Sequence, residues 1–257
     1  MAVTTFSLAG KVAIVTGGSR GIGRSIAIGL AEHGADVAIV ARKPEALDEA
    51  VKAVEAVGSG RRAIAVSANV RRIETLQGIV DETVERLGRL DILVNNAGTN
   101  PVFGPIQDID ERAWNVIMDT NVKQAHFLSN AAREAMLIHG EGGSVINVSS
   151  VGGYSASDVI GGYSVSKAAL IMLTQVQAKT WGVDGIRVNC IAPGLVKTEF
   201  ARALWEDEKN LRRTTASAAL RRIAEPDEMA GAVVYLASPA ASFVTGQTLV
   251  LDGGRLL

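Results

Sequence analysis

Short apolar runs alternate with longer helical patterns along the whole chain, and this alternation constrains the possible folds most. The short runs are rich in Val, Ile and Ala, as is typical of strands buried on both faces. We expect strands at 11–16, 36–41, 63–67, 91–94, 144–149, 186–191 and 248–251. We expect helices at 22–33, 44–57, 74–87, 111–138, 162–181 and 226–236, and a charged segment of helical composition at 198–215. The pattern predicts an α/β fold, a Rossmann-like doubly wound parallel sheet with helices on both faces.

The composition fits one soluble domain and argues against several classes of protein. The 257 residues contain no linker-like stretch, internal repeat or low-complexity segment, so we expect a single domain over 1–257. A net charge of −1 gives no general attraction to nucleic acid or to an anionic membrane. We find no apolar run of membrane-spanning length and no signal peptide, and therefore expect a cytoplasmic protein. Cys190, the single cysteine, is expected to be a buried inert thiol.

A glycine-rich turn joins the first expected strand to the first expected helix. Gly17, Gly21 and Gly23 have the spacing Gly-x-x-x-Gly-x-Gly, which differs from the usual Gly-x-Gly-x-x-Gly. A pyrophosphate needs a tight turn, a close approach of the backbone and free N–H groups at a helix N-terminus. An ordinary strand-to-helix turn could also use these glycines. Their place after the first strand of a βαβ unit favours nucleotide binding.

The end of the second strand indicates which dinucleotide would bind. Folds that bind NAD often place an acidic residue there for the ribose diol. Here Ala41 is followed by Arg42 and Lys43, and Arg20 lies in the glycine turn. Cations without a carboxylate suit the 2′-phosphate of NADP(H), although they could also be merely solvated. Asp36 begins the strand, at the wrong end to bind the ribose. We therefore expect NADP(H), with NAD(H) as the alternative.

Tyr163 and Lys167 are four residues apart at the start of a helix, so their side chains share one face. The lysine is expected to lower the pKa of the phenol from about 10, giving a general acid and base near neutral pH. Most such pairs are simply neighbours on a helix surface. A serine at the end of the preceding strand could hold a substrate oxygen. Asn121 is unfavourable within a long helix and either joins a polar chain with Lys167 or lies at the surface.

Two further polar and glycine clusters follow strands. Asn95-Asn96-Ala97-Gly98 ends the fourth strand, and Pro193-Gly194 with Thr198 follows the sixth. Each could contact a cofactor or be a plain turn. In open parallel sheets the ligand crevice lies outside the carboxyl ends of the strands, which is where all these clusters fall. The histidines have no ligand spacing, and we expect no metal site.

Taken together, these motifs resemble the short-chain dehydrogenase/reductase family over nearly the whole chain. The matching pieces are residues 16–23 and 95–98, Asn121, Ser150, Tyr163 with Lys167, and Pro193-Gly194 with Thr198. The family's serine lies thirteen residues before its tyrosine, which selects Ser150 over Ser149.

The resemblance implies four catalytic residues. Tyr163 gives or takes the hydroxyl proton, and Ser150 binds the substrate oxygen. Lys167 binds the nicotinamide ribose and lowers the pKa of the tyrosine, and Asn121 holds a water that relays protons. The implied cofactor contacts are Gly17, Ser19, Arg20, Gly21, Ile22, Gly23, Arg42, Asn69, Val70, Asn96, Ala97, Gly98, Tyr163, Lys167, Pro193, Gly194, Val196 and Thr198. Asn69 replaces the Asp that many members have beside the adenine, but it can still accept a hydrogen bond from the adenine amino group.

Two branches of the family are most similar. Segments 100–104 and 193–205 resemble tetrameric NADPH-dependent carbonyl and retinal reductases. The other branch comprises 3-oxoacyl reductases, which are expected to dock an acidic carrier protein on basic residues; here those places hold Glu141 and Asp184. We therefore expect an NADPH-dependent oxidoreductase that reversibly reduces a ketone or aldehyde.

The alternatives are a 3-oxoacyl-thioester reductase and an NAD-dependent secondary alcohol dehydrogenase. A nucleotide-binding regulator without activity is disfavoured because the catalytic set is complete. Small apolar residues on several faces of helices 111–138 and 163–181 predict pairing across a two-fold axis, in a homodimer or homotetramer. The substrate pocket is expected to be apolar, with Phe200, Leu204 and Trp205 on a lid or, alternatively, in a subunit contact. Its expected lining is Tyr154, Val196, Phe200, Leu204 and Trp205.

Overall fold

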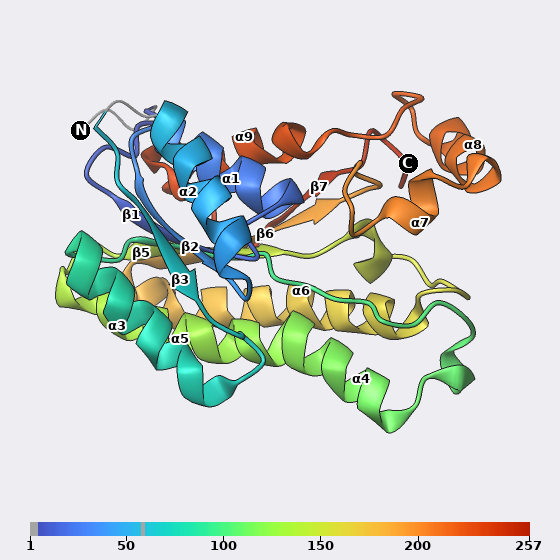
Figure 1. Cartoon of the computed structure of the whole chain (residues 1–257), viewed down its shortest axis with the longest axis horizontal. Helices are drawn as coiled ribbons and strands as arrows, with labels where there is room; N and C mark the ends of the chain where they lie inside the picture. Colours follow the sequence, from blue (N-terminus) through green and yellow to red (C-terminus); the bar gives the residue numbers. More distant parts are fainter. Residues whose placement is uncertain (1–4, 58–59) are drawn as a thin grey trace.

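The chain folds into a seven-stranded parallel sheet with helices on both faces (Figure 1). A computed structural model describes residues 5–57 and 60–257. The strand order is β3-β2-β1-β4-β5-β6-β7, and neighbouring strands pair in parallel. The strands are β1 (Val12–Thr16), β2 (Asp36–Ala41), β3 (Ala63–Ser67), β4 (Ile92–Asn95), β5 (Gly143–Val148), β6 (Ile186–Pro193) and β7 (Thr248–Leu251). The predicted fold class is confirmed.

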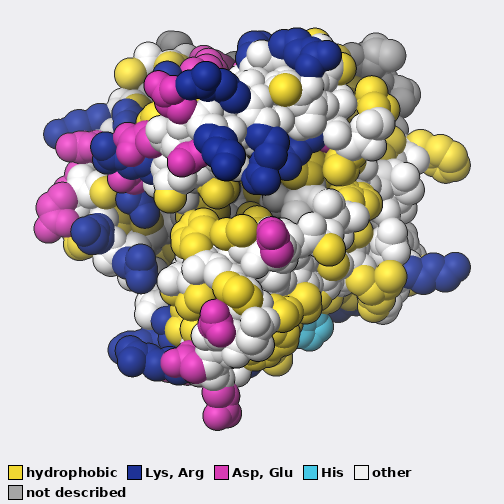
Figure 2. All heavy atoms as spheres, turned by 90° about the vertical axis from the view of Figure 1, so that its right-hand side faces the viewer, with side chains coloured by type: hydrophobic (Ala, Val, Ile, Leu, Met, Phe, Trp, Pro, Cys, Tyr) yellow, Lys and Arg dark blue, Asp and Glu magenta, His cyan; other side chains and the backbone are white. Residues whose placement is uncertain are grey.

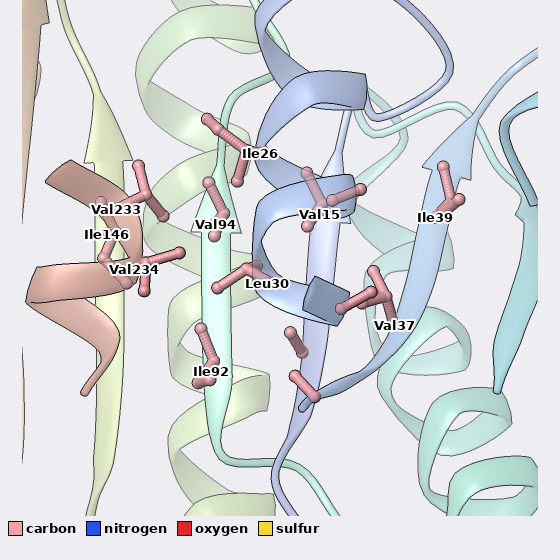
Figure 3. Close-up of a cluster of buried hydrophobic side chains, with 14 of the residues drawn as sticks. Val15, Ile26, Leu30, Val37, Ile39, Ile92, Val94, Ile146, Val233 and Val234 are labelled. Atoms are coloured by element: carbon pink, nitrogen blue, oxygen red, sulfur yellow. The ribbon is translucent and has the colours of Figure 1, made fainter. Parts of the chain in front are cut away.

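Two apolar layers hold the helices against the sheet. On one face α1 (Gly21–Glu32), α2 (Pro44–Val57) and α9 (Ala230–Ala237) cover alternate strand residues such as Val15 and Ile39 (Figure 3). On the other face α3 (Leu76–Leu87), α5 (Gln124–Ile138) and α6 (Gly161–Trp181) cover the intervening residues. Because side chains alternate across a strand, continuous Val, Ile and Ala runs supply both layers.

One predicted helix, 111–138, is divided in the structure. It comprises α4 (Glu111–Met118), a π-helical turn at Asp119–Lys123, and α5. The charged segment at 198–215 forms two short helices, α7 (Arg202–Trp205) and α8 (Glu208–Ser217). Short 3₁₀ turns lie at Ile73–Thr75, Ile106–Asp108, Val151–Gly153, Gly182–Asp184, Pro226–Met229 and Pro239–Ala241. No helix within the described ranges is both long and apolar enough to cross a bilayer.

The amino ends of the strands are joined by ion pairs. Asp91, just before β4, accepts hydrogen bonds from Lys11 and Arg89, and both cations also contact Glu141 before β5. Asp91 is 5% exposed and also accepts a hydrogen bond from the backbone N–H of Val12. Asp36, at the start of β2, pairs with an arginine before β3, as expected for a residue at the wrong end to bind a ribose.

The strand order reverses between β1 and β4. The chain runs outward from β1 to β2 and β3, then returns to β4 on the other side of β1. A crevice forms at the carboxyl ends of the strands at such a reversal. The loops after β1 and β4 therefore meet there, and the loop after β5 is beside them.

Candidate active site

The glycine turn after β1 has the backbone that an anion site needs. Gly17 and Gly21 have positive φ angles of 64° and 52°, which a side chain would strain. At Gly23 a Cβ atom would lie 2.4 Å from the carbonyl oxygen of Gly17, so no larger residue fits. Helix α1 begins at Gly21 without a side-chain cap, which leaves the N–H groups of its first turn available to a phosphate. The turn thus fits a pyrophosphate.

The Asn95–Gly98 segment at the end of β4 holds the glycine turn in place through hydrogen bonds. The Asn96 amide donates to the carbonyl oxygens of Thr16, at 2.8 Å, and Gly17, at 3.2 Å. The Thr16 hydroxyl accepts from the backbone N–H groups of Asn96 and Ala97. The side chain of Asn96 therefore shapes the glycine turn, while Gly98 leaves the backbone exposed.

Three exposed cations lie at the predicted cofactor end of the crevice. Arg20 ends the glycine turn, and Arg42 and Lys43 follow β2. Across residues 5–57 and 60–257, none of the three forms an ion pair with a carboxylate. Asn69, after β3, accepts a hydrogen bond from the backbone N–H of Arg71. The Val70 side chain packs into the core, so only its backbone is free to face a cofactor.

Tyr163, Lys167 and Ser150 meet where α6 begins and β5 ends. The Nζ of Lys167 lies 5.4 Å from the centroid of the Tyr163 ring and donates to the carbonyl oxygen of Val148 at 2.7 Å. Lys167 is only 3% exposed. The Ser150 hydroxyl accepts from the backbone N–H of Gly152 and is hydrogen-bonded to Tyr163. The three predicted side chains therefore share one site.

Burial shifts the pKa values of both Tyr163 and Lys167. It raises the pKa of Tyr163 to about 12, and the hydrogen bond with Ser150 only partly opposes this. Burial also lowers the pKa of Lys167 to about 8. The expected pKa of Tyr163 below 10 is not found, because the loss of solvent around the phenol outweighs the hydrogen bond with Ser150. At neutral pH Tyr163 keeps its proton, which suits a proton donor.

Asn121 lies in the π-helical turn, and this turn directs its side chain inward. Its amide donates to the carbonyl oxygen of Thr99 at 3.0 Å and to the hydroxyl of Ser166 at 2.8 Å, and its oxygen accepts from the Thr99 N–H. Asn121 does not bond directly to Lys167. Both lie 3.6 Å from the position that a Cβ atom of Gly98 would occupy, so they face the same small space. The extra residue of a π turn often marks a functional site.

The segment after β6 reaches back over the glycine turn. Pro193 ends the strand, and Gly194 lies so close to Asp252 that a Cβ atom would be 2.9 Å from its Cα. Thr198 lies against Gly21, 3.3 Å from the position of a Cβ atom there. The prediction that the Val196 side chain lines the pocket is wrong: it is 3% exposed and packs in the core, where the segment pairs with Ala224, so only its backbone is free to face a cofactor.

The segment that was predicted to form a lid or a subunit contact continues from Thr198. The Trp205 indole donates to the carbonyl oxygen of Thr198 at 2.8 Å, which closes the segment on itself. The Phe200 ring is 6.1 Å from the Tyr163 ring and is half exposed. Leu204 is partly buried, and its carbonyl oxygen accepts from Asn210 of α8. Phe200 thus brings this segment against Tyr163, a predicted catalytic side chain.

The mouth of the site is apolar. Figure 2 shows the end of the molecule at the right of Figure 1, where hydrophobic side chains fill the middle of the face and Lys and Arg gather above. Tyr154 and Phe200, which were predicted to line the pocket, are exposed, and so are Phe103, Ile106 and Val159, which were not predicted to line it. The loop carrying Phe103 pairs with the segment before α6, through the N–H of Gly104 and the carbonyl oxygen of Val159. Strand pairing can be predicted from apolar and polar residues that alternate along a strand. The Gly104–Ile160 pairing is a single bridge, so the sequence there is too short to show such alternation.

Comparison with known proteins identifies the family. A family model described as "Enoyl-(Acyl carrier protein) reductase" matches residues 17–255. The chain is 41% identical over 247 residues to rabbit (Oryctolagus cuniculus) dehydrogenase/reductase SDR family member 4, covering 96% of this chain and 94% of the relative. The chain belongs to the short-chain dehydrogenase/reductase family. Its members act on CH–OH groups with NAD(P), and this chain is an oxidoreductase of that class.

Solved structures agree with this assignment. Gluconate 5-dehydrogenase from Burkholderia cenocepacia, in complex with NADP and tartrate, superposes with a TM-score of 0.93 at 34% identity. That match covers 100% of this chain and 99% of the other. Carveol dehydrogenase from Mycobacterium avium, in complex with NAD, superposes with a TM-score of 0.91 at 32% identity, covering 98% and 99%. Family members therefore bind either dinucleotide.

Proposed function

We propose that this short-chain dehydrogenase/reductase reduces a ketone or aldehyde to an alcohol with NADPH, reversibly, with Tyr163 as the proton donor. The observation that carries the proposal is the meeting of Tyr163, Ser150 and Lys167 beside a glycine turn that fits a pyrophosphate. Lys167 is buried without a carboxylate partner among the described residues. Burying an unpaired ammonium costs free energy, so its presence favours a functional role.

The cofactor would lie along the crevice, held by residues of four loops. The first turn of α1 would bind the pyrophosphate through backbone N–H groups. Asn69 and the backbone at Val70 would contact the adenine, and Gly98 and Thr198 would lie against the nicotinamide half. The bound nicotinamide would supply the hydride that reduces the carbonyl carbon.

The chain's own residues would handle the oxygen and its proton. The Ser150 hydroxyl would donate a hydrogen bond to the carbonyl oxygen and fix it beside Tyr163. Tyr163, protonated at neutral pH because its pKa is about 12, would give its proton to that oxygen. Lys167 would bind the ribose, and Asn121 would hold a water in the space that it shares with Lys167. Alcohol oxidation needs the phenolate, so it should be favoured at higher pH than reduction.

The preference for NADPH rests on the three cations without carboxylate partners. Arg20, Arg42 and Lys43 surround the place where a 2′-phosphate would lie, and Ala41 offers no carboxylate to a ribose diol. A relative crystallised with NADP supports this choice, although another binds NAD.

The substrate is proposed to be a small carbonyl compound with an apolar part. The mouth formed by Tyr154, Phe200 and their neighbours is apolar. A carrier-protein thioester is the second candidate, favoured by the description of the family model. It is weakened because Glu141 and Asp184 are acidic and already paired, Asp184 with Arg133 at 2.6 Å. An acidic carrier would meet no open basic site at either place.

The active form is proposed to be a homodimer or homotetramer. Helix α6 exposes an apolar stripe of Val165, Met172 and Val176, and α5 exposes Phe127 and Ile138. A second copy that lays its own α5 and α6 on this surface would bury it in both chains. A sedimentation mass equal to one chain would contradict this assembly.

Two measurements on the purified protein test the proposed function. NADPH should bind more tightly than NADH in calorimetry, and a screen of ketones, aldehydes, quinones and 3-oxoacyl thioesters should show turnover of apolar carbonyl compounds.

Tyr163→Phe should lower kcat about 10²–10⁴-fold and leave NADPH affinity nearly unchanged, because only the proton donor is lost. A variant that retains full activity would overturn the assignment of Tyr163, and tighter binding of NADH would overturn the cofactor preference.

A further inference from the structure

We propose that Ser149 and Gly153 are positioning residues that clamp the backbone of Lys167 and so set the distance between Ser150 and Tyr163. The inference rests on the proposed reductase function, and it assigns roles to two residues that the catalytic scheme does not use. Neither touches the reacting atoms. They act through the segment 148–153, which carries Ser150, and through the first turns of α6.

The first part of the clamp is a pair of hydrogen bonds between the Val148–Ser149 segment at the end of β5 and Lys167 of α6. The Ser149 hydroxyl donates to the carbonyl oxygen of Lys167 at 2.8 Å, and the Lys167 ammonium donates to the carbonyl oxygen of Val148 at 2.7 Å. Ser149 and Lys167 are both 3% exposed, so water does not compete for these bonds. One residue of the helix is therefore held to the strand at its backbone and at its side-chain tip.

Gly153 closes the clamp from the other side. A Cβ atom at this position would lie 2.9 Å from the carbonyl carbon of Lys167 and 3.0 Å from the nitrogen of Ala168. These are backbone atoms in the interior of a helix, which cannot move aside as a side chain can. The backbone φ of Gly153 is not positive, so the close approach is what requires glycine here.

Ser150 lies between the two contacts. Its carbonyl oxygen accepts from the N–H of Gly153, and its hydroxyl accepts from the N–H of Gly152. On the other side, the Ser149 N–H donates to the carbonyl oxygen of Ile191 in β6. The Ser150 hydroxyl thus has a fixed height above the sheet and a fixed distance from α6. A shift of about 1 Å at a reacting group can cost 10²-fold in rate, so this bracket is expected to affect turnover.

Ser144 provides a matched control for Ser149. It lies in β5, which Ser149 directly follows, is 2% exposed, and its hydroxyl donates to the carbonyl oxygen of Leu236 at 3.0 Å. Ser144→Ala and Ser149→Ala therefore remove the same kind of buried bond, one near the start of β5 and one just past its end. Gly78, in α3, is a matched control for Gly153, because a Cβ atom there meets nothing within 4 Å.

The test compares steady-state kinetics of five single variants with the wild type. Ser149→Ala should lower kcat about tenfold and leave the KM for NADPH within about twofold, and Ser149→Thr should restore part of the rate. Gly153→Ala should lower kcat at least as much, whereas Ser144→Ala and Gly78→Ala should keep it even where the melting temperature falls. In the Tyr163→Phe background, Ser149→Ala should have almost no further effect, because both act on one step.

Two results would overturn the clamp. One is equal kcat for Ser149→Ala and Ser144→Ala, and the other is full activity of Gly153→Ala. Should Ser149→Ala fail to fold, the Gly153 and Gly78 pair decides alone. An inactive wild type across the carbonyl screen would instead count against the proposed function, so the two failures are distinguishable.

Discussion

The cations at the two ends of the sheet have different partners: carboxylates at one end and a backbone carbonyl at the other. At the amino ends of the strands, Lys11 and Arg89 lie between Asp91 and Glu141, so each cation touches two carboxylates. At the carboxyl ends, Lys167 is buried deeper than any of these groups, yet its ammonium bonds to a backbone carbonyl. Both ends are built from loops between the same strands, so topology does not explain the difference.

The contrast fits a stabilising role for the amino ends and the proposed catalytic role for the carboxyl ends. Pairing offsets the cost of burying an ion, whereas a buried ion without a partner of opposite charge keeps that cost in full. The lowered pKa of Lys167, about 8, reflects that cost, since burial disfavours its charged form. The π-helical turn at Asn121 is a further departure from regular structure at the same end. The amino ends contain no comparable departure in the described part of the chain.

The largest effect is expected from removing the buried ammonium. Lys167→Met should lower turnover by about 10³-fold or more, because it removes the cation beside the proton donor. It should also raise the free energy of unfolding at pH 7, by about 1–3 kcal/mol, since an unpaired ion is replaced by an apolar chain of similar length. Activity assays and urea unfolding would measure the two effects. A variant that is both inactive and less stable would show that Lys167 contributes to stability.

The pH dependence of that stability difference sharpens the comparison. The native pKa of Lys167, about 8, lies below its unfolded value of 10.5, so between these values the unfolded chain binds more protons. The wild type should therefore gain stability relative to Lys167→Met as pH rises from about 8 to 10.5, and the cost should be complete below pH 8. A difference that stays constant over this window would contradict the assignment of the cost to the ammonium.

An intermediate effect is expected from breaking the paired end. Asp91→Ala should lower the free energy of unfolding by about 3–4 kcal/mol, because it leaves two cations and the Val12 N–H without their buried acceptor. Activity per folded molecule should remain near that of the wild type, since the site lies at the opposite end of the sheet. Asp91→Asn, which keeps an acceptor for Val12, should lose less. A large fall in kcat with either variant would mean that the two ends are coupled.

Local sequence was enough to predict the strands, the glycine turn and the residues that meet at the proposed catalytic site, because each depends on residue type and spacing over a few positions. It could not show the direction of the tyrosine pKa, since burial depends on what α6 packs against. Nor could it place Val196 in the core or join Lys11 to Asp91, eighty residues away. Asn121 was detectable by its poor helix propensity, but the π turn that carries it packs against α6, and this tertiary contact cannot be read from local sequence.

The smallest effect is expected at the rim of the paired end. Glu141 is exposed, yet its hydrogen bonds with Lys11 and then Arg89 lower its pKa to about 2. Any stability that it contributes is present above its ordinary pKa of 4.5 and lost as pH falls towards 2. Because solvent and salt screen such pairs, Glu141→Gln should shift the unfolding midpoint far less than Asp91→Ala, and not at all in about 0.5 M salt. A shift of the unfolding midpoint as large as that of Asp91→Ala and independent of salt would contradict this expectation. It would show that Glu141 contributes as much stability to the ion-pair cluster as the buried Asp91 does.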